Sequence, residues 1–364
     1  MDITCGIVGL PNVGKSTLFN ALTASEADVE NYPFCTIEPN ISVVPVPDHR
    51  LSELAKIYKP EKTTPTILEF FDIAGLVKGA SKGEGLGNQF LHNIRSVRAI
   101  LHVVRCFEDQ NVTHIEGGVD PRRDIETIET ELLLKDIETA ERKIETISKK
   151  AKSGDKKLKD EVELYERVRD HLSEGRHARY FPYSTVEKPL LESLSLLTAK
   201  PVMYIANVDE EEYIRGNGKI DIIREIAKKE GSVVVPICTK LEAEVAQLPA
   251  DEQKTFLQEL GINEPGLHKV IREAYGLLDL ITFFTGGPKE VRAWSVRKGS
   301  TAYEAAGEIH SDFQRGFIRA EVIKADELLR WRSEAAVREK GGVFLQGKEY
   351  VVQDGDVIYF RFNV

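Results

Sequence analysis

The residues with the clearest chemical meaning lie near the start of the chain, in the segment GLPNVGKS at residues 9–16. Its spacing, G-x-x-x-x-G-K-S, is that of loops that wrap nucleotide phosphates. Lys15 would neutralise the β- and γ-phosphates, Ser16 would ligate Mg²⁺ through its hydroxyl, and Gly14 would let the backbone approach the phosphates. The other loop residues that we expect at the nucleotide are Asn12, Val13 and Thr17.

The surroundings of this loop favour the same interpretation. An apolar strand pattern at residues 3–8 precedes it, and residues 17–22 can start a helix. Such a helix would direct its free N–H groups and the positive end of its dipole toward the phosphates. The alternative, a glycine turn with a chance lysine, does not explain this order of strand, loop and helix.

A second motif, DIAG at residues 72–75, matches the D-x-x-G element of switch GTPases and ends a predicted strand at residues 66–71. Asp72 would hold the Mg²⁺ shell, and Gly75 would offer its N–H to the γ-phosphate. Thr36 precedes this motif where a first switch belongs, and it could complete the Mg²⁺ shell. The glycine-rich residues 77–87 then become a mobile second switch.

The group that orients the attacking water is harder to assign. Ras-like enzymes place a glutamine after this glycine, whereas this chain has Leu76. We therefore expect slow unaided turnover and name Lys15 and His114 as the catalytic residues, because a histidine has a suitable pKa for such work. A surface histidine without a catalytic role remains the alternative, and His92 and His102 compete with His114.

The base-reading loop is altered as well. GTPases use N-K-x-D, but here the sequence reads NVDE at residues 207–210. Glu210 has one more methylene than aspartate, which should spoil its geometry toward the two donors of guanine, while the backbone of Val208 could serve the adenine N6. Asn207 can still bond the base edge. ATP preference and a mere loss of discrimination both stay open on this argument; a rival match, TKLE at residues 239–242, better fits the later loop that closes over the base.

Asn12 raises a further question inside the phosphate loop. Its side-chain oxygen could bind a monovalent cation, K⁺, beside the phosphates. An Asx bond that stabilises the turn explains the residue equally well.

The elements that must position these residues follow an α/β pattern. Strand-like runs alternate with helical stretches, which is typical of a mostly parallel sheet with phosphate ligands at the carboxyl ends of its strands. The predicted strands are residues 3–8, 41–46, 66–71, 99–106, 201–206 and 232–238.

Two further regions depart from this pattern. Residues 122–195 carry apolar side chains at helical spacing amid many charges, interrupted at Ser153-Gly154-Asp155, and predict an antiparallel helical hairpin, either a rigid insert or a partner-docking arm. Residues 281–364 read as a small α+β module of β-grasp type, ending in a turn at residues 354–356 and a last strand. The nucleotide-binding domain would then comprise residues 1–121 and 196–280.

Composition limits the remaining possibilities. The 364 residues carry a formal net charge of −10, which argues against general coating of nucleic acid. No apolar run has the length of a bilayer span and the first residues lack a secretory signal, so we expect a cytoplasmic protein without a membrane partner. The four cysteines are far apart and predict reduced core thiols rather than disulfides or a zinc site.

With these motifs in order, the whole chain resembles the YchF subfamily of Obg-like ATPases, within the TRAFAC class of P-loop NTPases. The segments that carry the resemblance are GLPNVGKST, PFCTIEPN, DIAGLVKGASKGEGLGNQF, NVDE and the C-terminal module. It implies a G domain with a coiled-coil insertion, a TGS module of β-grasp type, and ATP preferred over GTP. It also implies association with the ribosome, a ribosomal subunit, or other translation or stress machinery.

The resulting prediction is a monomeric, Mg²⁺-dependent ATPase whose nucleotide state controls partner binding. A conventional GTPase and a binding scaffold with incidental hydrolysis are the other hypotheses. RNA contact through the TGS module is a further expectation, against the alternative of a solvated charged surface. Its candidate phosphate contacts are Arg292, Arg297, Lys298 and Arg319.

Overall fold

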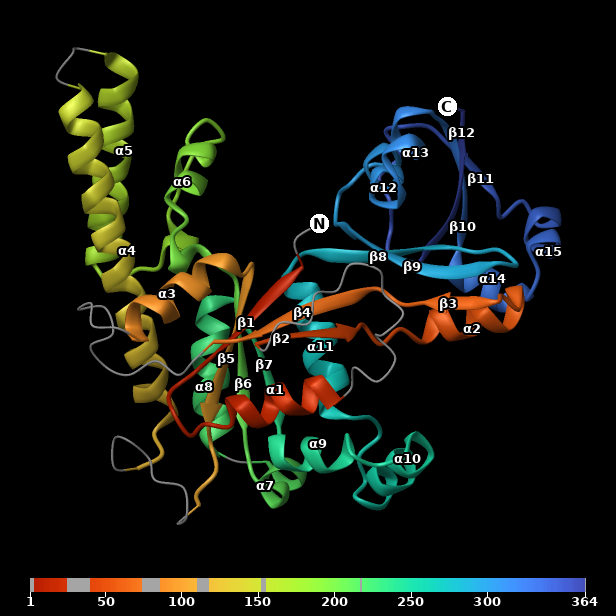
Figure 1. Cartoon of the computed structure of the whole chain (residues 1–364), viewed down its shortest axis with the longest axis horizontal. Helices are drawn as coiled ribbons and strands as arrows, with labels where there is room; N and C mark the ends of the chain where they lie inside the picture. Colours follow the sequence, from red (N-terminus) through yellow and green to blue (C-terminus); the bar gives the residue numbers. More distant parts are fainter. Residues whose placement is uncertain are drawn as a thin grey trace.

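The computed structural model describes residues 3–24, 40–73, 86–109, 118–151, 155–216 and 218–363. Within them the chain forms a first sheet with helices around it, a long helical hairpin that projects from that sheet, and a second sheet at the opposite side (Figure 1). The predicted fold class, an α/β nucleotide-binding fold with a helical-hairpin insertion and a C-terminal β-grasp module, is confirmed.

The first sheet has six strands in the order β2-β4-β1-β5-β6-β7, all parallel except the antiparallel pair of β2 and β4. Its central strands are buried along their whole length, which explains their nearly continuous apolar sequences. Each predicted strand is present with both ends within one residue of expectation. The strands are β1 (Thr4–Val8), β2 (Ile41–Pro45), β4 (Ile67–Asp72), β5 (Ala99–Arg105), β6 (Val202–Asn207) and β7 (Val233–Ile237).

The strand order decides where a ligand can bind. The central strand β1 lies between β4 and β5, so the chain connections leave it toward opposite sides. In open parallel sheets this arrangement opens a crevice at the carboxyl ends of the strands. The helices of this region are α1 (Lys15–Ala24), α3 (Leu86–Ser96), α7 (Glu210–Arg215), α8 (Gly218–Glu230), α9 (Thr239–Val245), α10 (Ala250–Glu259) and α11 (Gly266–Leu277).

The helical hairpin consists of α4 (Pro121–Ala151) and α5 (Lys156–Ser173), and Asp155 caps the start of α5. The apolar stripe of α4 serves two different partners. Its first turns, through Ile125 and Ile128, belong to the core of the first sheet, whereas Ile147 packs with the apolar side chains of α5. The chain returns to the sheet through η3 (Ala178–Tyr180), α6 (Lys188–Leu194) and η4 (Leu197–Ala199).

The C-terminal sheet has the order β11-β10-β12-β8-β9-β3, with the last strand β12 parallel to β8. Its strands are β3 (Lys62–Thr64), β8 (Leu280–Thr285), β9 (Glu290–Arg297), β10 (Phe317–Lys324), β11 (Phe344–Gln346) and β12 (Asp356–Phe362). Its helices are α12 (Ala302–Ile309), α13 (Ser311–Arg315), α14 (Ala325–Trp331) and α15 (Glu334–Glu339). The two helices α12 and α13 meet at His310, whose extended backbone, with φ of −167°, ends α12 and whose ring caps α13.

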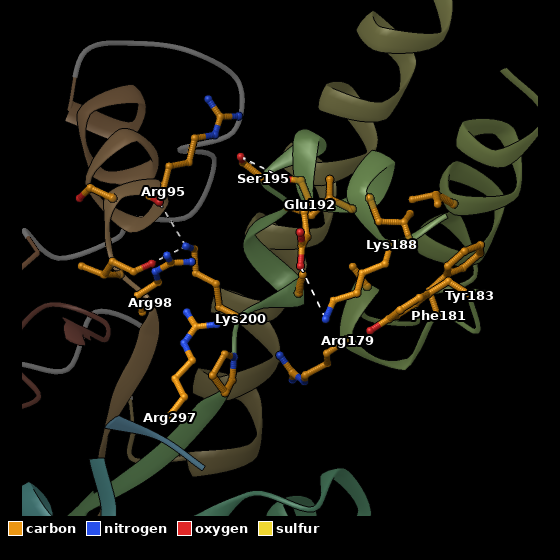
Figure 2. Close-up of a pocket in the computed structure, with 18 residues that line it drawn as sticks. Arg95, Arg98, Arg179, Phe181, Tyr183, Lys188, Glu192, Ser195, Lys200 and Arg297 are labelled. Atoms are coloured by element: carbon orange, nitrogen blue, oxygen red, sulfur yellow. Dashed lines mark hydrogen bonds and ion pairs between the residues drawn. The ribbon is translucent and has the colours of Figure 1, made fainter. Parts of the chain in front are cut away.

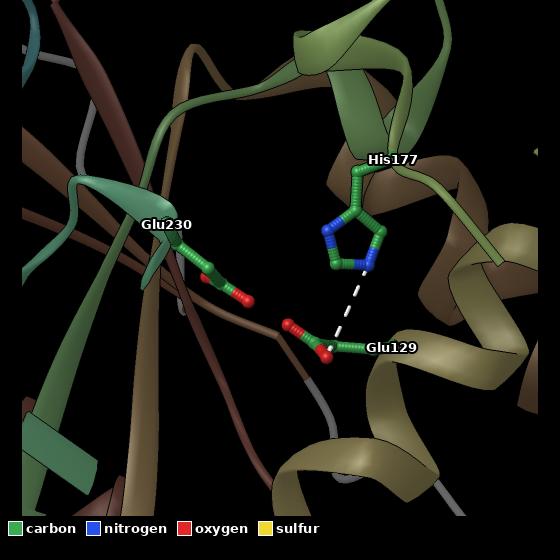
Figure 3. A group of neighbouring side chains, drawn as sticks. All are labelled: Glu129, His177 and Glu230. Atoms are coloured by element: carbon green, nitrogen blue, oxygen red, sulfur yellow. Dashed lines mark ion pairs between the residues drawn. The ribbon is translucent and has the colours of Figure 1, made fainter. Parts of the chain in front are cut away.

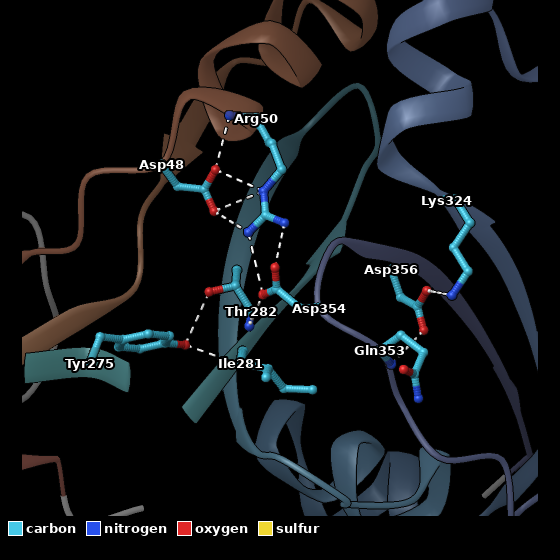
Figure 4. A network of polar contacts seen from close by, with 9 residues as sticks. All are labelled: Asp48, Arg50, Tyr275, Ile281, Thr282, Lys324, Gln353, Asp354 and Asp356. Carbon is cyan, nitrogen blue, oxygen red and sulfur yellow. Dashed lines mark hydrogen bonds and ion pairs between the residues drawn. The ribbon is translucent and has the colours of Figure 1, made fainter. Parts of the chain in front are cut away.

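A segment far away in the sequence completes this second sheet. Strand β3 pairs with β9, and the preceding helix α2 (His49–Tyr58) packs Leu51 and Leu54 against Phe284. At the start of α2, the guanidinium of Arg50 bonds the carboxylates of Asp48 and Asp354 (Figure 4). Part of the predicted nucleotide-binding domain thus belongs to the C-terminal sheet, and the exact domain bounds stay a prediction.

Two expectations from composition can be compared with the structure. Cys5, Cys106 and Cys238 are buried and are not joined to one another by a disulfide, and Cys35 lies outside the described residues. Among the residues described, no helix combines the length and apolar character that crossing a membrane requires.

Candidate nucleotide-binding site

The phosphate loop joins β1 to α1 at the carboxyl edge of the first sheet. Close packing beneath the loop explains its glycines: a Cβ on Gly9 would lie 2.5 Å from the carbonyl oxygen of Val103, and one on Gly14 would collide with the amide of Asn207. Gly14 also has a φ of 100°, which side chains rarely adopt. The loop is therefore held firmly against β5 and β6.

Lys15 opens helix α1 and turns its side chain back over the loop. Its Nζ donates a hydrogen bond to the carbonyl oxygen of Leu10 at 2.6 Å, and the residue is buried. Burial lowers the pKa of Lys15 to about 8, although the nearby carboxylate of Asp72 opposes this shift. The first turn of α1 carries no acidic side chain. A buried ammonium at a helix N-terminus is an arrangement that attracts an anion.

Asp72 lies at the end of β4, opposite Ile7 of the central strand. Ser16 donates a hydrogen bond to its carboxylate, and burial raises the pKa of Asp72, against the effects of Lys15 and Ser16. The Oδ1 atom of Asp72 is buried and has no hydrogen-bond partner in the described part of the chain. A buried carboxylate oxygen without a partner is costly unless a ligand completes it. A carboxylate beside a serine hydroxyl suits Mg²⁺, so these residues fit the predicted metal site.

The side chain of Asn207 performs a task that sequence reasoning missed. Its Nδ2 donates to the carbonyl oxygen of Val13 at 2.8 Å, and its Oδ1 accepts from the N–H of Thr239 at 3.1 Å. Both ends of the amide thus tie the phosphate loop to the start of α9. The structure records these contacts for Asn207, whereas its predicted bond to the base edge remains a prediction.

The structure also describes the altered base-reading loop, NVDE at residues 207–210. Val208 is buried, and its N–H donates to the carbonyl oxygen of Ile237 at 2.9 Å. Asp209 caps helix α7, and Glu210 is an exposed residue of its first turn. Glu242 of the rival motif is buried and accepts hydrogen bonds from the N–H groups at the start of α11. That carboxylate is therefore engaged within the fold, and the assignment of NVDE as the base-reading loop stays a prediction.

Several predicted site residues lie outside the described residues, namely Thr36, Gly75 and His114. The two competing histidines can be placed. His102 is fully enclosed in β5, and burial, assisted by Lys15, lowers its pKa to about 3, so it is a neutral core residue. His92 is exposed on α3.

A phosphate loop at the carboxyl end of a central parallel strand, with an aspartate ending the neighbouring strand, defines a P-loop NTPase with a G-domain fold. Comparisons with known proteins agree. A family described as "50S ribosome-binding GTPase" matches residues 4–150, and the family of YchF GTPase C-terminal regions, described as "Protein of unknown function (DUF933)", matches residues 280–363.

Curated relatives and a solved structure resemble the chain over its full length. It is 55% identical over 364 residues to "Ribosome-binding ATPase YchF" of Escherichia coli O157:H7, with 100% of both chains covered. The protein of the same name from Bacillus subtilis is 53% identical over 366 residues, with the same coverage. The structure of the Schizosaccharomyces pombe YchF GTPase is 39% identical, has a TM-score of 0.87, and covers 99% of this chain and 98% of that one. The chain belongs to the YchF family.

Proposed function

We propose that this protein is a Mg²⁺-dependent ATPase that converts ATP to ADP and phosphate, and that its nucleotide state controls association with the ribosome. The observation that carries the proposal is the buried Oδ1 of Asp72, which lacks a partner in the described part of the chain and lies beside Ser16 and Lys15. The names of the relatives, ribosome-binding ATPases, support both halves of the proposal.

Each loop residue has a proposed role. Lys15 moves its ammonium from the carbonyl oxygen of Leu10 to the β- and γ-phosphates, and Ser16, Thr36 and Asp72 hold Mg²⁺. When bound, Mg²⁺ neutralises the charge that develops on the phosphate oxygens. The N–H groups of the loop and of the first turn of α1, including Val13, Gly14 and Thr17, bind the phosphates, and Gly75 adds one more N–H at the γ-phosphate.

Selection of adenine follows from the base loop. Because the N–H of Val208 is used by Ile237, the backbone group it can offer to the adenine N6 amino group is its carbonyl oxygen. Glu210 replaces the aspartate that would accept two hydrogen bonds from guanine. We therefore assign ATP as the preferred substrate and GTP as the weaker one.

Water activation and the monovalent cation remain parts of the proposal. Leu76 cannot orient water, so His114 takes this role, and His114→Ala should slow single-turnover hydrolysis without weakening ATP binding.

Asn12, which is exposed and has a φ of 62°, would bind K⁺ beside the phosphates. Equal turnover in K⁺ and Na⁺ at the same ionic strength would rule out that cation site.

For the ribosome, the favoured contact is a basic groove of about 680 Å³ between α3, the base of the hairpin and the end of β9 (Figure 2). Of the four arginines and lysines predicted from the C-terminal module, Arg297 lines this groove. The other basic residues along it are Arg95, Arg98, Arg179, Lys188 and Lys200. Such a cluster in a chain of net charge −10 provides the local site that RNA phosphates need.

The other three predicted phosphate contacts of the C-terminal module do not line this groove. Arg292 stacks its guanidinium on the ring of Trp294, 3.9 Å from the ring centre, and Arg319 is exposed on β10, away from the groove lining. Lys298 follows Arg297 at the end of β9 and is exposed. Arg297 and Lys298 are thus the pair in this module that we assign to RNA.

A phosphate-release assay tests the proposed ATPase activity. The wild type should release phosphate from ATP faster than from GTP in Mg²⁺, and Lys15→Ala should release none. A faster rate with GTP would favour a conventional GTPase. If a hydrolysis-dead variant restores growth of a deletion strain as well as the wild type does, the scaffold hypothesis replaces the switch.

Co-sedimentation with ribosomes tests the proposed ribosome association. Removal of residues 281–364 would expose Leu51 and Leu54, which pack on the C-terminal sheet, so charge reversal is the cleaner change. Arg98→Glu with Arg297→Glu should weaken nucleotide-dependent co-sedimentation and spare ATP hydrolysis, whereas Arg319→Glu serves as the matched control. Unchanged co-sedimentation of the double variant would contradict the groove assignment. Ribosome association would place the protein in the cytoplasm, where we propose that it works as a monomer.

A further inference from the structure

A second cluster of buried and partly buried polar groups lies at the base of the hairpin, and Figure 3 shows three of its members. Glu129 comes from α4, Glu230 from the end of α8, Tyr204 from β6, and His177 and Arg179 from the chain around η3. The cluster therefore joins the hairpin to a strand and a helix of the nucleotide-binding sheet.

Counting hydrogen-bond donors leaves one carboxylate of this cluster without the hydroxyl hydrogen of Tyr204. The hydroxyl oxygen of Tyr204 lies 3.0 Å from Oε1 of Glu129 and 2.8 Å from Oε2 of Glu230. A tyrosine has a single hydroxyl hydrogen, so it can donate to only one carboxylate at a time. One carboxylate oxygen of Glu129 and one of Glu230 also lie within 4.8 Å of each other. Two ionised carboxylates at this separation repel each other, and a proton on one of them would remove the repulsion and supply the missing donor.

The charges of the cluster also favour one extra proton. Arg179 supplies one positive charge, with its Nη2 3.4 Å from Oε2 of Glu230 and 3.9 Å from Oε1 of Glu129. The same nitrogen lies 2.8 Å from Nδ1 of His177, which must therefore accept and leave the ring hydrogen on Nε2. Burial, together with Arg179, lowers the pKa of His177 to about 4, so the ring is neutral. Two carboxylates facing one cation leave an excess negative charge.

A metal ion would also supply positive charge, because ligand atoms of Glu129, His177 and Glu230 lie within 4.8 Å of one another. The tautomer of His177 argues against it. Its Nε2, the nitrogen that faces Glu129 at 3.9 Å, carries the hydrogen, and Arg179 already occupies the space beside both carboxylates. A proton satisfies these groups without moving any of them.

We propose that Glu129 and Glu230 form a proton-binding site that fastens the helical hairpin to the nucleotide-binding sheet, and that loss of this proton loosens the hairpin base. The remaining titratable neighbours bond or pack against other groups. Tyr180 donates its hydroxyl to the backbone carbonyl of Glu230, and His102 packs as a neutral ring 5.5 Å from the ring of Tyr204. His171 bonds the carbonyl oxygen of His177 through its Nε2.

The direction of the pH effect follows from the pKa of Glu129. Burial and the carboxylate of Glu230 raise this pKa to about 7 in the folded protein, compared with about 4.3 in an unfolded chain. The folded state thus holds a proton that the unfolded state has lost between those values. Stability from this site is fully present below about pH 4.3, falls as the pH rises toward 7, and is lost above it.

Thermal unfolding of Glu129→Gln tests the proposal, because glutamine is a neutral group of the same shape. At pH 8.5 the variant should melt a few degrees above the wild type, and at pH 5.5 the two midpoints should approach each other. Glu145→Gln, an exposed position on the same helix, should follow the wild type at both values. Parallel curves for the wild type and Glu129→Gln would overturn the proposal.

A second measurement on the wild type does not depend on how the variant folds. Carbon NMR of side-chain carboxyls should show one glutamate that titrates near neutral pH, and its absence would refute the site.

Zn²⁺ added to chelator-treated protein provides the remaining test. Stoichiometric binding that Glu129→Gln removes would mean that the cluster holds a metal ion instead of a proton.

Discussion

Two aspartates at opposite ends of the nucleotide-binding region show how similar residues serve different purposes. Asp136, on the hairpin helix α4, accepts hydrogen bonds from Leu197 N at 2.7 Å, Thr198 N at 2.8 Å and the Thr198 hydroxyl at 2.7 Å. Asp72, beside the phosphate loop, has a buried oxygen without a hydrogen-bond partner in the described part of the chain. The first carboxylate is completed by the fold, and the second is left for a ligand.

The same difference separates the hairpin base from the phosphate loop. At the hairpin base, Asp136 and Tyr204 bond groups from elements that are distant in sequence. At the phosphate loop, Lys15 relies on one carbonyl oxygen and has its pKa lowered by burial. Incomplete pairing costs stability, and proteins retain it at functional sites. Removing a polar group should therefore harm folding at one end and ligand binding at the other.

The largest effect is expected for Lys15→Ala. The variant loses the ammonium that faces the phosphates, and its affinity for ATP with Mg²⁺ should fall about 30-fold to 5,000-fold, since loss of one partner of a buried charge pair costs about 2–5 kcal/mol. Its unfolding midpoint without nucleotide should not fall. Calorimetry measures the affinity, with the exposed Lys56→Ala as the control. Unchanged affinity would contradict the assigned role.

Asp136→Ala should show the opposite pattern. Three donors at the hairpin base lose their acceptor, so the free energy of unfolding should fall by about 3 kcal/mol, while ATP affinity stays the same. Denaturant unfolding followed by circular dichroism measures the loss, and Asp170→Ala, an exposed position on α5, should change little. A large loss of ATP affinity with normal stability would remove the distinction between the two ends.

Asp72→Asn sharpens the comparison further. Asparagine keeps the shape and removes a buried charge, so the free energy of unfolding without nucleotide should stay equal or rise, by up to about 1 kcal/mol. Mg²⁺-dependent ATP hydrolysis should disappear. The same change at Asp136 should lower the midpoint. If Asp72→Asn destabilises the protein as much as Asp136→Asn, then Asp72 is a structural residue.

A smaller effect is expected from pH. Because the pKa of Lys15 is lowered to about 8, its ammonium is present below that value and is lost above it. ATP affinity should be flat from pH 6.5 to 7.5 and should then fall by up to about tenfold per pH unit. Lys15→Arg keeps its charge and should bind ATP independently of pH over this range. A flat profile to pH 9.5 in the wild type would show that Lys15 keeps its proton.

The sequence predicted what depends on local spacing. Strand β1, the phosphate loop and Asp72 follow from short motifs, because their geometry is set by neighbouring residues. The amide of Asn207, which bonds the carbonyl of Val13, could not be predicted in that role. The pairing of β3 with β9 was missed for the same reason, since it joins residues more than 200 positions apart.

The hairpin base illustrates the limit most clearly. Glu129 reads as one of many charged residues on an amphipathic helix, and its buried environment depends on Tyr204 and Glu230 from other elements. A charged residue in a charged helix gives no local signal of burial. For Thr36, Gly75 and His114, which lie outside the described residues, the sequence predictions stand without structural comparison.

The most direct test of the account is a titration of the wild-type protein with ATP and with GTP under the same Mg²⁺ concentration. The loop at residues 207–210 lacks the lysine and the aspartate that select guanine, and the N–H of Val208 is already bonded to the carbonyl oxygen of Ile237. The account predicts that ATP binds more tightly than GTP, by roughly the 1–3 kcal/mol that a bidentate base contact is worth. GTP binding as tightly as ATP, or more tightly, would contradict it.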